Sequence, residues 1–147
     1  MYDPQDFPTP RRALIALSTD ASWTCPVRRV ARAAAASQKS PVYRHFFTHE
    51  LDSVAFQGLG AFHALDVYFV FQHAKALTYT LDPAELALSH EMLGYWSRFA
   101  ITGDPNGDPA VTWPSYEPTS DLHLVLDVNI VAGDGVRTVR CDLLDSL

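Results

Sequence analysis

The sequence predicts an α/β protein in which a sheet is covered by helices. Residues 41–47 are rich in β-branched and aromatic side chains, and they carry apolar groups on both faces. Apolar groups on both faces are typical of a strand that is covered from both sides. Two segments, 26–36 and 82–102, have the composition and end signals of helices. The chain has 147 residues and is 48% apolar, which is enough for one domain with a buried core.

The first predicted helix, over 26–36, starts with a proline, which suits the first turn of a helix. An alanine run then sustains it. We predict that its arginines, Arg28, Arg29 and Arg32, form its solvated face.

The second predicted helix begins with Asp82-Pro-Ala-Glu85, a capping-box arrangement, and ends before Gly103. Apolar side chains cover more than half of its circumference. So broad an apolar surface indicates packing from more than one side.

The end of the chain is predicted to form a short β-hairpin. Leu122–Leu126 and Val136–Cys141 have strand composition and are joined across a Gly133-Asp-Gly135 turn. One buried-type strand and one hairpin are too little sheet for the apolar surface of the helices. We therefore expect these elements to pack against protein that this chain does not contain.

The net charge argues against some classes of partner, and the N-terminus bears on targeting. A formal net charge of −6 argues against nucleic acid or an anionic membrane surface, since both attract basic patches. No apolar run is long enough to span a bilayer. The opening residues, MYDPQDFPTPRR, lack the basic, apolar and small-residue order of a secretory signal. We therefore predict no nucleic-acid partner and no membrane span.

His45 and His49 have the four-residue spacing of paired metal ligands. That spacing brings two histidines together on a helix, as in H-E-x-x-H, but these two lie on a predicted strand and its edge. We therefore predict neither a metal site nor a cofactor.

The two cysteines, Cys25 and Cys141, lie near opposite ends of the sequence. Their number alone leaves open two unrelated buried thiols or one bridge. A bridge would close a loop of about a hundred residues, which the chain-entropy model values at about 4.7 kcal/mol. It would also imply an oxidising compartment.

Several motifs occur in one order along nearly the whole chain. They are Asp20-Ala-Ser-Trp-Thr-Cys25-Pro26, residues 41–47, Gly60-Ala-Phe-His63 with Tyr68-Phe-Val-Phe71, Tyr95-Trp-Ser-Arg-Phe-Ala100, Gly103-Asp-Pro-Asn106 with Trp113-Pro114, and Arg140-Cys141-Asp142. In this order they resemble the type-B carboxylesterases, the cholinesterase-like branch of the α/β-hydrolases. The resemblance implies that residues 1–147 are the C-terminal part of a carboxylesterase domain, and hence a C-terminal fragment of an α/β-hydrolase fold.

The resemblance also implies roles for individual residues. His63 matches the histidine of the family's catalytic triad, which accepts a proton from the serine hydroxyl and returns it to the leaving alcohol. Cys25 and Cys141 match the cysteines of a family disulfide. Such a disulfide implies a secreted or periplasmic location.

The rest of the catalytic machinery is not found in the sequence. There is no G-x-S-x-G motif, and the family order of serine, acid and histidine puts the nucleophile and the acid before Met1. We therefore expect a fragment of a carboxylic ester hydrolase that supplies the triad histidine and is inactive alone. The assembled fold would act on a small-molecule ester. The alternatives are a non-catalytic interaction protein, like the adhesion members of the cholinesterase-like family, and a degenerate remnant.

Three residues near His63 depart from the family pattern. Ala64 and Gln72 stand where glycine is common, and Asp66 stands where glutamate is usual.

Overall fold

The computed structural model describes residues 2–147, and these residues divide into two compact units. The first unit contains the residues up to Arg44, together with Ser115–Leu122 and Asp134–Leu147. The second unit contains His45–Pro114 and His123–Gly133. Each unit is therefore built from segments that lie far apart in the sequence.

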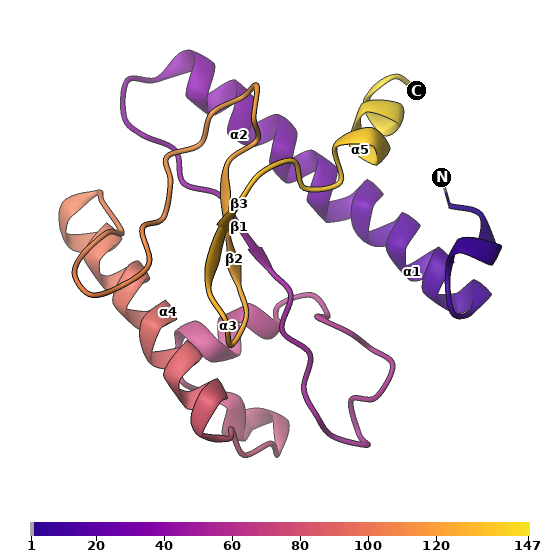
Figure 1. Ribbon diagram of the computed structural model, residues 1–147, viewed down its shortest axis with the longest axis horizontal. Helices are drawn as coiled ribbons and strands as arrows, with labels where there is room; N and C mark the ends of the chain where they lie inside the picture. The colour runs from indigo at the N-terminus through magenta and orange to yellow at the C-terminus, as the bar shows by residue number, and fades with distance from the viewer. Residues whose placement is uncertain (1) are drawn as a thin grey trace. The chain divides into compact units, whose positions relative to one another are not determined.

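The first unit is helical. A 3-10 turn, η1 (Pro4–Asp6), precedes α1 (Pro10–Thr19), and a π-helical turn, η2 (Asp20–Thr24), joins α1 to α2 (Cys25–Ser37). Figure 1 shows α1 and α2 following one another, with α5 (Thr138–Asp145) beside the place where they meet. The helix predicted over 26–36 is confirmed as α2.

The prediction that all three arginines of α2 face solvent is wrong. Arg28 is fully buried, whereas the side chain of Arg29 is 51% exposed. Arg28 can be buried because its guanidinium forms ion pairs with two carboxylates of α5, those of Asp142 and Asp145.

The second unit contains a three-stranded sheet in the order β1-β2-β3. Strand β1 (His45–Phe47) runs parallel to β2 (His123–Leu126), which is antiparallel to β3 (Val131–Gly133). Of the strand predicted over 41–47, only the last three residues join this sheet. The residues before them belong to the first unit, where Tyr43 forms an isolated bridge with Ser115.

The predicted C-terminal hairpin is half confirmed. Its first strand is β2, but the partner of β2 is β3 and not residues 136–141. Most of that segment belongs to α5. Cys141 is fully buried in this helix, and the helix contacts α2. Packing on a neighbouring helix therefore outweighs the strand propensity of its valines.

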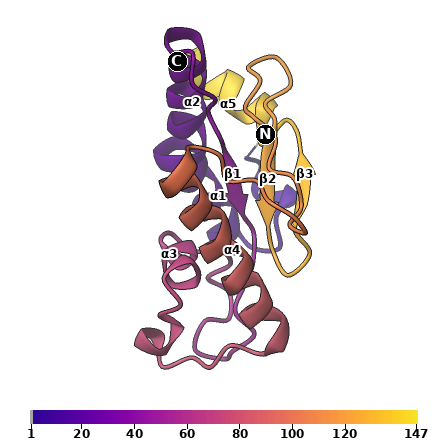
Figure 2. The same cartoon turned by 90° about the vertical axis from the view of Figure 1, so that its left-hand side faces the viewer.

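Two helices cover one face of the sheet. They are α3 (Leu65–Val70), followed by a 3-10 turn, η3 (Ala74–Leu77), and α4 (Pro83–Thr102). His45 and Phe47 point to the same face of β1, because side chains alternate along a strand. The ring of His45 contacts Trp96 of α4, and the ring of Phe47 contacts Phe69 of α3. Figure 2 shows both helices on this side of the strands.

The start and the end of α4 agree with the sequence prediction. Asp82 and Glu85 form the capping box, and Gly103 ends the helix in the left-handed conformation, with φ of 79°. The fully buried core of the second unit lies where the helices meet the sheet: Leu65, Phe69, Met92, Tyr95, Leu124 and Leu126. None of the helices within residues 2–147 is long and apolar enough to cross a membrane.

Candidate functional site

His63 lies in the turn that leads into α3. The turn is closed by two backbone hydrogen bonds: the Phe62 amide donates to the Gly60 carbonyl at 2.8 Å, and the Leu65 amide donates to the Phe62 carbonyl at 3.1 Å. His63 is exposed, whereas Leu65, two residues later, is fully buried. The turn therefore presents the imidazole at the surface while the chain next to it is anchored in the core.

Ala64 and Gln72, at the two ends of α3, adopt backbone conformations that favour glycine. Ala64 precedes the helix with φ of 68° and ψ of 5°, and Gln72 follows it with φ of 53°. A side chain costs about 1–2 kcal/mol in the left-handed region, because its Cβ crowds the next carbonyl oxygen. This geometry gives a physical reason for the glycines that are common at these two positions.

Asp66, the third departure, contacts β1. Its Oδ2 lies 3.5 Å from Nε2 of His45, and both side chains are about one-third exposed. The hydrogen bond from His45 is the main cause that lowers the pKa of Asp66, and it outweighs burial, which acts in the opposite direction. The His45 ring is also edge-on to Trp96 and Trp113, at centroid distances of 5.1 and 5.9 Å.

The serine in the middle of α4 is not placed to act as a nucleophile. Ser89 is 1% exposed, and its hydroxyl donates a 2.6 Å hydrogen bond to the Phe69 carbonyl. The hydroxyl therefore fastens α4 to α3.

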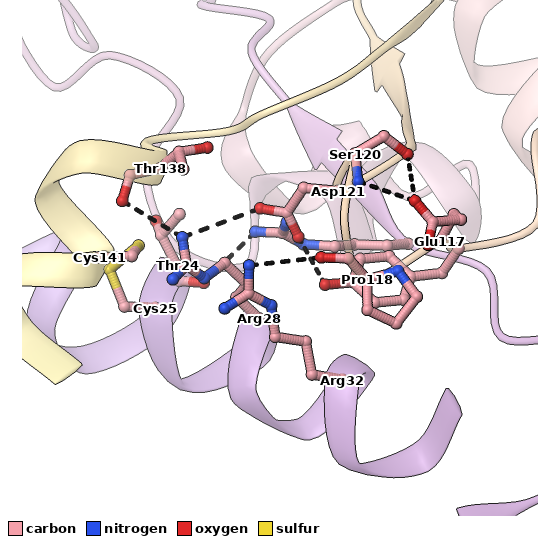
Figure 3. A network of polar contacts seen from close by, with 12 residues as sticks. Thr24, Cys25, Arg28, Arg32, Glu117, Pro118, Ser120, Asp121, Thr138 and Cys141 are labelled. Atoms are coloured by element: carbon pink, nitrogen blue, oxygen red, sulfur yellow. Dashed lines mark hydrogen bonds and ion pairs between the residues drawn. A yellow bond between two sulfur atoms is a disulfide. The ribbon is translucent and has the colours of Figure 1, made fainter. Parts of the chain in front are cut away.

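The structure joins Cys25 to Cys141 in a disulfide, with their Cα atoms 5.1 Å apart, which confirms the pairing. The two residues are 116 positions apart and link the start of α2 to α5 (Figure 3). This disulfide belongs to the first unit, whereas His63 belongs to the second.

Next to the disulfide, Arg28 binds α5 through the two terminal nitrogens of its guanidinium. Nη1 donates to the Thr138 carbonyl at 3.2 Å, and Nη2 contacts the carboxylates of Asp142 and Asp145. Burial acts to lower the pKa of Arg28. The hydrogen bond and charge of Asp142, together with the charges of Asp121 and Asp145, outweigh burial and raise it.

Asp121 connects the segment 115–122 to the rest of the first unit (Figure 3). Its Oδ1 lies 3.1 Å from Nη1 of Arg44 and accepts a 2.5 Å hydrogen bond from the Tyr116 hydroxyl. Arg44 also reaches the Thr24 carbonyl, at 3.5 Å. Asp121 and Arg44 are both buried, so each charge compensates the other in a place where water does not solvate them.

A second cluster, in the second unit, was not predicted from the sequence. The imidazole of His49 lies between two carboxylates: Nε2 is 2.9 Å from Oε1 of Glu85, and Nδ1 is 2.9 Å from Oδ1 of Asp127. These acids lie 36 and 78 positions away from His49, so no local motif reveals them. Residues 2–147 contain no group of three or more His, Cys, Asp or Glu side chains that could hold a metal ion.

A model of the Carboxylesterase family matches residues 1–144. The chain is 33% identical over 140 residues to acetylcholinesterase 1 of Caenorhabditis elegans, covering 86% of this chain and 22% of that protein. It is 37% identical over 117 residues to human carboxylesterase 5A, covering 73% of this chain and 20% of that protein. Among solved structures, a PNB esterase superposes with a TM-score of 0.75 at 26% identity, covering 97% of this chain and 29% of that one.

The fold is therefore that of part of an α/β-hydrolase esterase. The chain belongs to the carboxylesterase family, as its resemblance to the type-B carboxylesterases predicts. It spans about a fifth of the length of these curated relatives.

Proposed function

We propose that this chain is the C-terminal part of a type-B carboxylesterase and that His63 is its catalytic base. The observation that carries the proposal is the position of His63, which is exposed on an anchored turn inside a segment that resembles the family's histidine loop. The nucleophilic serine and the triad acid would come from protein outside these 147 residues.

The proposed chemistry follows from the properties of imidazole. His63 takes the proton of the serine hydroxyl as the serine oxygen attacks the ester carbonyl, and it gives that proton to the departing alcohol. In the second half of the cycle it takes a proton from water, whose oxygen attacks the acyl-enzyme. It then returns this proton to the serine as the carboxylic acid leaves. The substrate is a small carboxylic ester, and no cofactor is required.

Apolar side chains exposed on both units support the assignment as a fragment. Val30 of α2 is 68% exposed, and Phe71 and Ile101 of the second unit are 71% and 83% exposed. Within residues 2–147, β1 also has β2 as its only strand neighbour. Apolar surface and an open strand edge of this kind are commonly covered by further protein.

The direct test is a chimera in which this chain replaces the matching 29% of the PNB esterase. We expect the chimera to hydrolyse p-nitrophenyl esters and His63→Ala to reduce kcat at least about a thousandfold. His90→Ala, which changes an exposed histidine of α4, should have no effect. A folded chimera whose activity does not depend on His63 would refute the assignment.

The isolated chain gives a second test. We expect it to show no ester hydrolysis above background, because it lacks a nucleophile for the histidine to activate. Turnover by the chain alone would contradict its assignment as a fragment.

A further inference from the structure

The segment that carries His63 is closed at its base by a pair of buried side chains. His49 stands before the segment and Glu85 after it, and His49 Nε2 lies 2.9 Å from Glu85 Oε1. His49 is 9% exposed and Glu85 is 2% exposed. The contact therefore brings together, out of water, the two ends of a stretch whose middle contains His63.

The ring of His49 is held by hydrogen bonds on two sides. Each ring nitrogen has an ionisable carboxylate as its partner, at 2.9 Å. The Phe69 ring packs edge-on to the imidazole with a centroid distance of 5.4 Å, which keeps solvent from that side. Hydrogen bonds in such buried surroundings are stronger than hydrogen bonds exposed to water.

Glu85 also binds the far end of the same stretch. Its Oε1 accepts a 2.9 Å hydrogen bond from the Tyr79 hydroxyl, and its Oε2 accepts a 2.8 Å bond from the Asp82 amide. This carboxylate, in the first turn of α4, thus binds His49, which follows β1, and two residues that precede α4.

The aromatic rings continue this contact to His63. The Tyr79 ring lies edge-on to Phe56, with centroids 6.1 Å apart, and Phe56 stacks on Phe62 at 5.9 Å with an interplanar angle of 16°. Phe62 immediately precedes His63. An unbroken series of contacts therefore runs from His49 through Glu85, Tyr79 and Phe56 to the turn of His63.

We propose that His49, Glu85 and Tyr79 form a clasp that fixes the position of the His63 turn. They are positioning residues, since the contacts described for them are with one another, with Asp127 and with the segment, and not with a reacting atom. The inference rests on the proposed function only in treating His63 as a base. The physical claim, that the clasp orders the turn, holds for the chain by itself.

The experiment measures backbone amide exchange by mass spectrometry on the 147-residue chain. The variants are Tyr79→Phe, which removes one hydroxyl and keeps the ring, and His49→Gln, which replaces the imidazole ring by an amide. Tyr68→Phe, on α3, and His90→Gln, on α4, are the matched controls. We expect exchange in residues 50–64 to become about tenfold faster in both clasp variants, with α2 and the C-terminal half of α4 unchanged and both controls like the parent chain.

A spectroscopic measurement separates positioning from general stability. The Cε1 proton resonance of His63 is identified by its loss in His63→Ala. We expect this resonance to shift or broaden in Tyr79→Phe and His49→Gln but not in the two controls.

The proposal is overturned if residues 50–64 exchange as slowly in both clasp variants as in the parent chain. It is also overturned if exchange rises equally along the whole chain, or if the parent chain itself shows no protection in this segment. None of these measurements requires catalysis. A failure of the clasp is therefore distinguishable from a failure of His63 as the base.

Discussion

Ala64 and Gln72 stand at opposite ends of α3, and both hold the left-handed backbone conformation, with φ of 68° and 53°. Glycine adopts this conformation without the Cβ clash that other residues suffer. We therefore expect Ala64→Gly and Gln72→Gly each to raise the free energy of unfolding by about 1 kcal/mol.

Urea denaturation of the 147-residue chain measures this gain. Ala61→Gly is the control, because Ala61 lies in the same turn without a positive φ. It should lower stability, since glycine has more conformational freedom in the unfolded chain. Equal effects of the three substitutions would contradict the role of the left-handed conformation.

We expect substitutions of the neighbouring arginines Arg28 and Arg29 to lower the free energy of unfolding by very different amounts. Arg28→Met removes a fully buried guanidinium from its carboxylates, of which Asp142 is 59% and Asp145 24% exposed, and we expect a loss of about 1.5–3 kcal/mol, as for a hydrogen bond to a charged group. Arg29 is half exposed, and we expect Arg29→Met to cost about 0.5 kcal/mol or less. Thermal and urea unfolding of the two variants test the difference, and similar losses would show that Arg28 is not held by these contacts.

We expect the disulfide to contribute strongly to the stability of the first unit. Cys25 and Cys141 close a loop in which they stand 116 positions apart, and the chain-entropy model gives about 4.7 kcal/mol for a loop of that order. We expect the double variant Cys25→Ala/Cys141→Ala to lose about 4 kcal/mol of unfolding free energy. Reductant should weaken the parent chain and leave the double variant unchanged. If both respond alike, the loss does not come from the bridge.

We expect Asp127 to contribute to the free energy of unfolding at neutral pH and to lose this contribution in acid. Burial acts to raise the pKa of Asp127, but hydrogen bonds from His49, the Val128 amide and Thr48 outweigh it and leave the pKa below its ordinary value. A carboxyl group with a lowered folded pKa stabilises the protein above its unfolded pKa. This stabilisation is lost as the pH falls through the folded pKa.

Asp127→Asn should therefore lower the unfolding free energy by a constant amount near neutral pH. The difference from the parent chain should shrink below about pH 4. Asp134→Asn, at an exposed position, is the control and should give a small difference that does not vary with pH. A difference for Asp127→Asn that persists in acid would contradict the cause given for the pKa.

Local signals account for the elements that sequence reasoning predicted well. The ends of α4 follow from the capping box at Asp82 and the glycine at 103, and α2 follows from its proline and alanine run. The error at 136–141 arose because two valines favour a strand locally, while packing against α2 and the bond to Cys25 favour a helix.

The clusters could not be predicted, because their partners are distant in sequence. Arg28 meets Asp142 across 114 positions, and His49 meets Asp127 across 78. The position of Arg28 in the sequence pattern of α2 does not distinguish a buried arginine from a solvated one. For the candidate site, the family motifs led to His63, but they gave no indication of the clasp formed by His49, Glu85 and Tyr79.

The sequence order of the two units has a consequence for synthesis. All of the second unit is made before Asp134–Leu147, the last segment of the first unit. Cys25 therefore leaves the ribosome with its partner still unmade, and at about 5–20 residues per second the 116 intervening positions take roughly 6–23 s. During that time its thiol is available to any other cysteine or oxidant nearby. The bond between Cys25 and Cys141 can thus form only after residue 141 has been made, which places it late in the folding of the first unit.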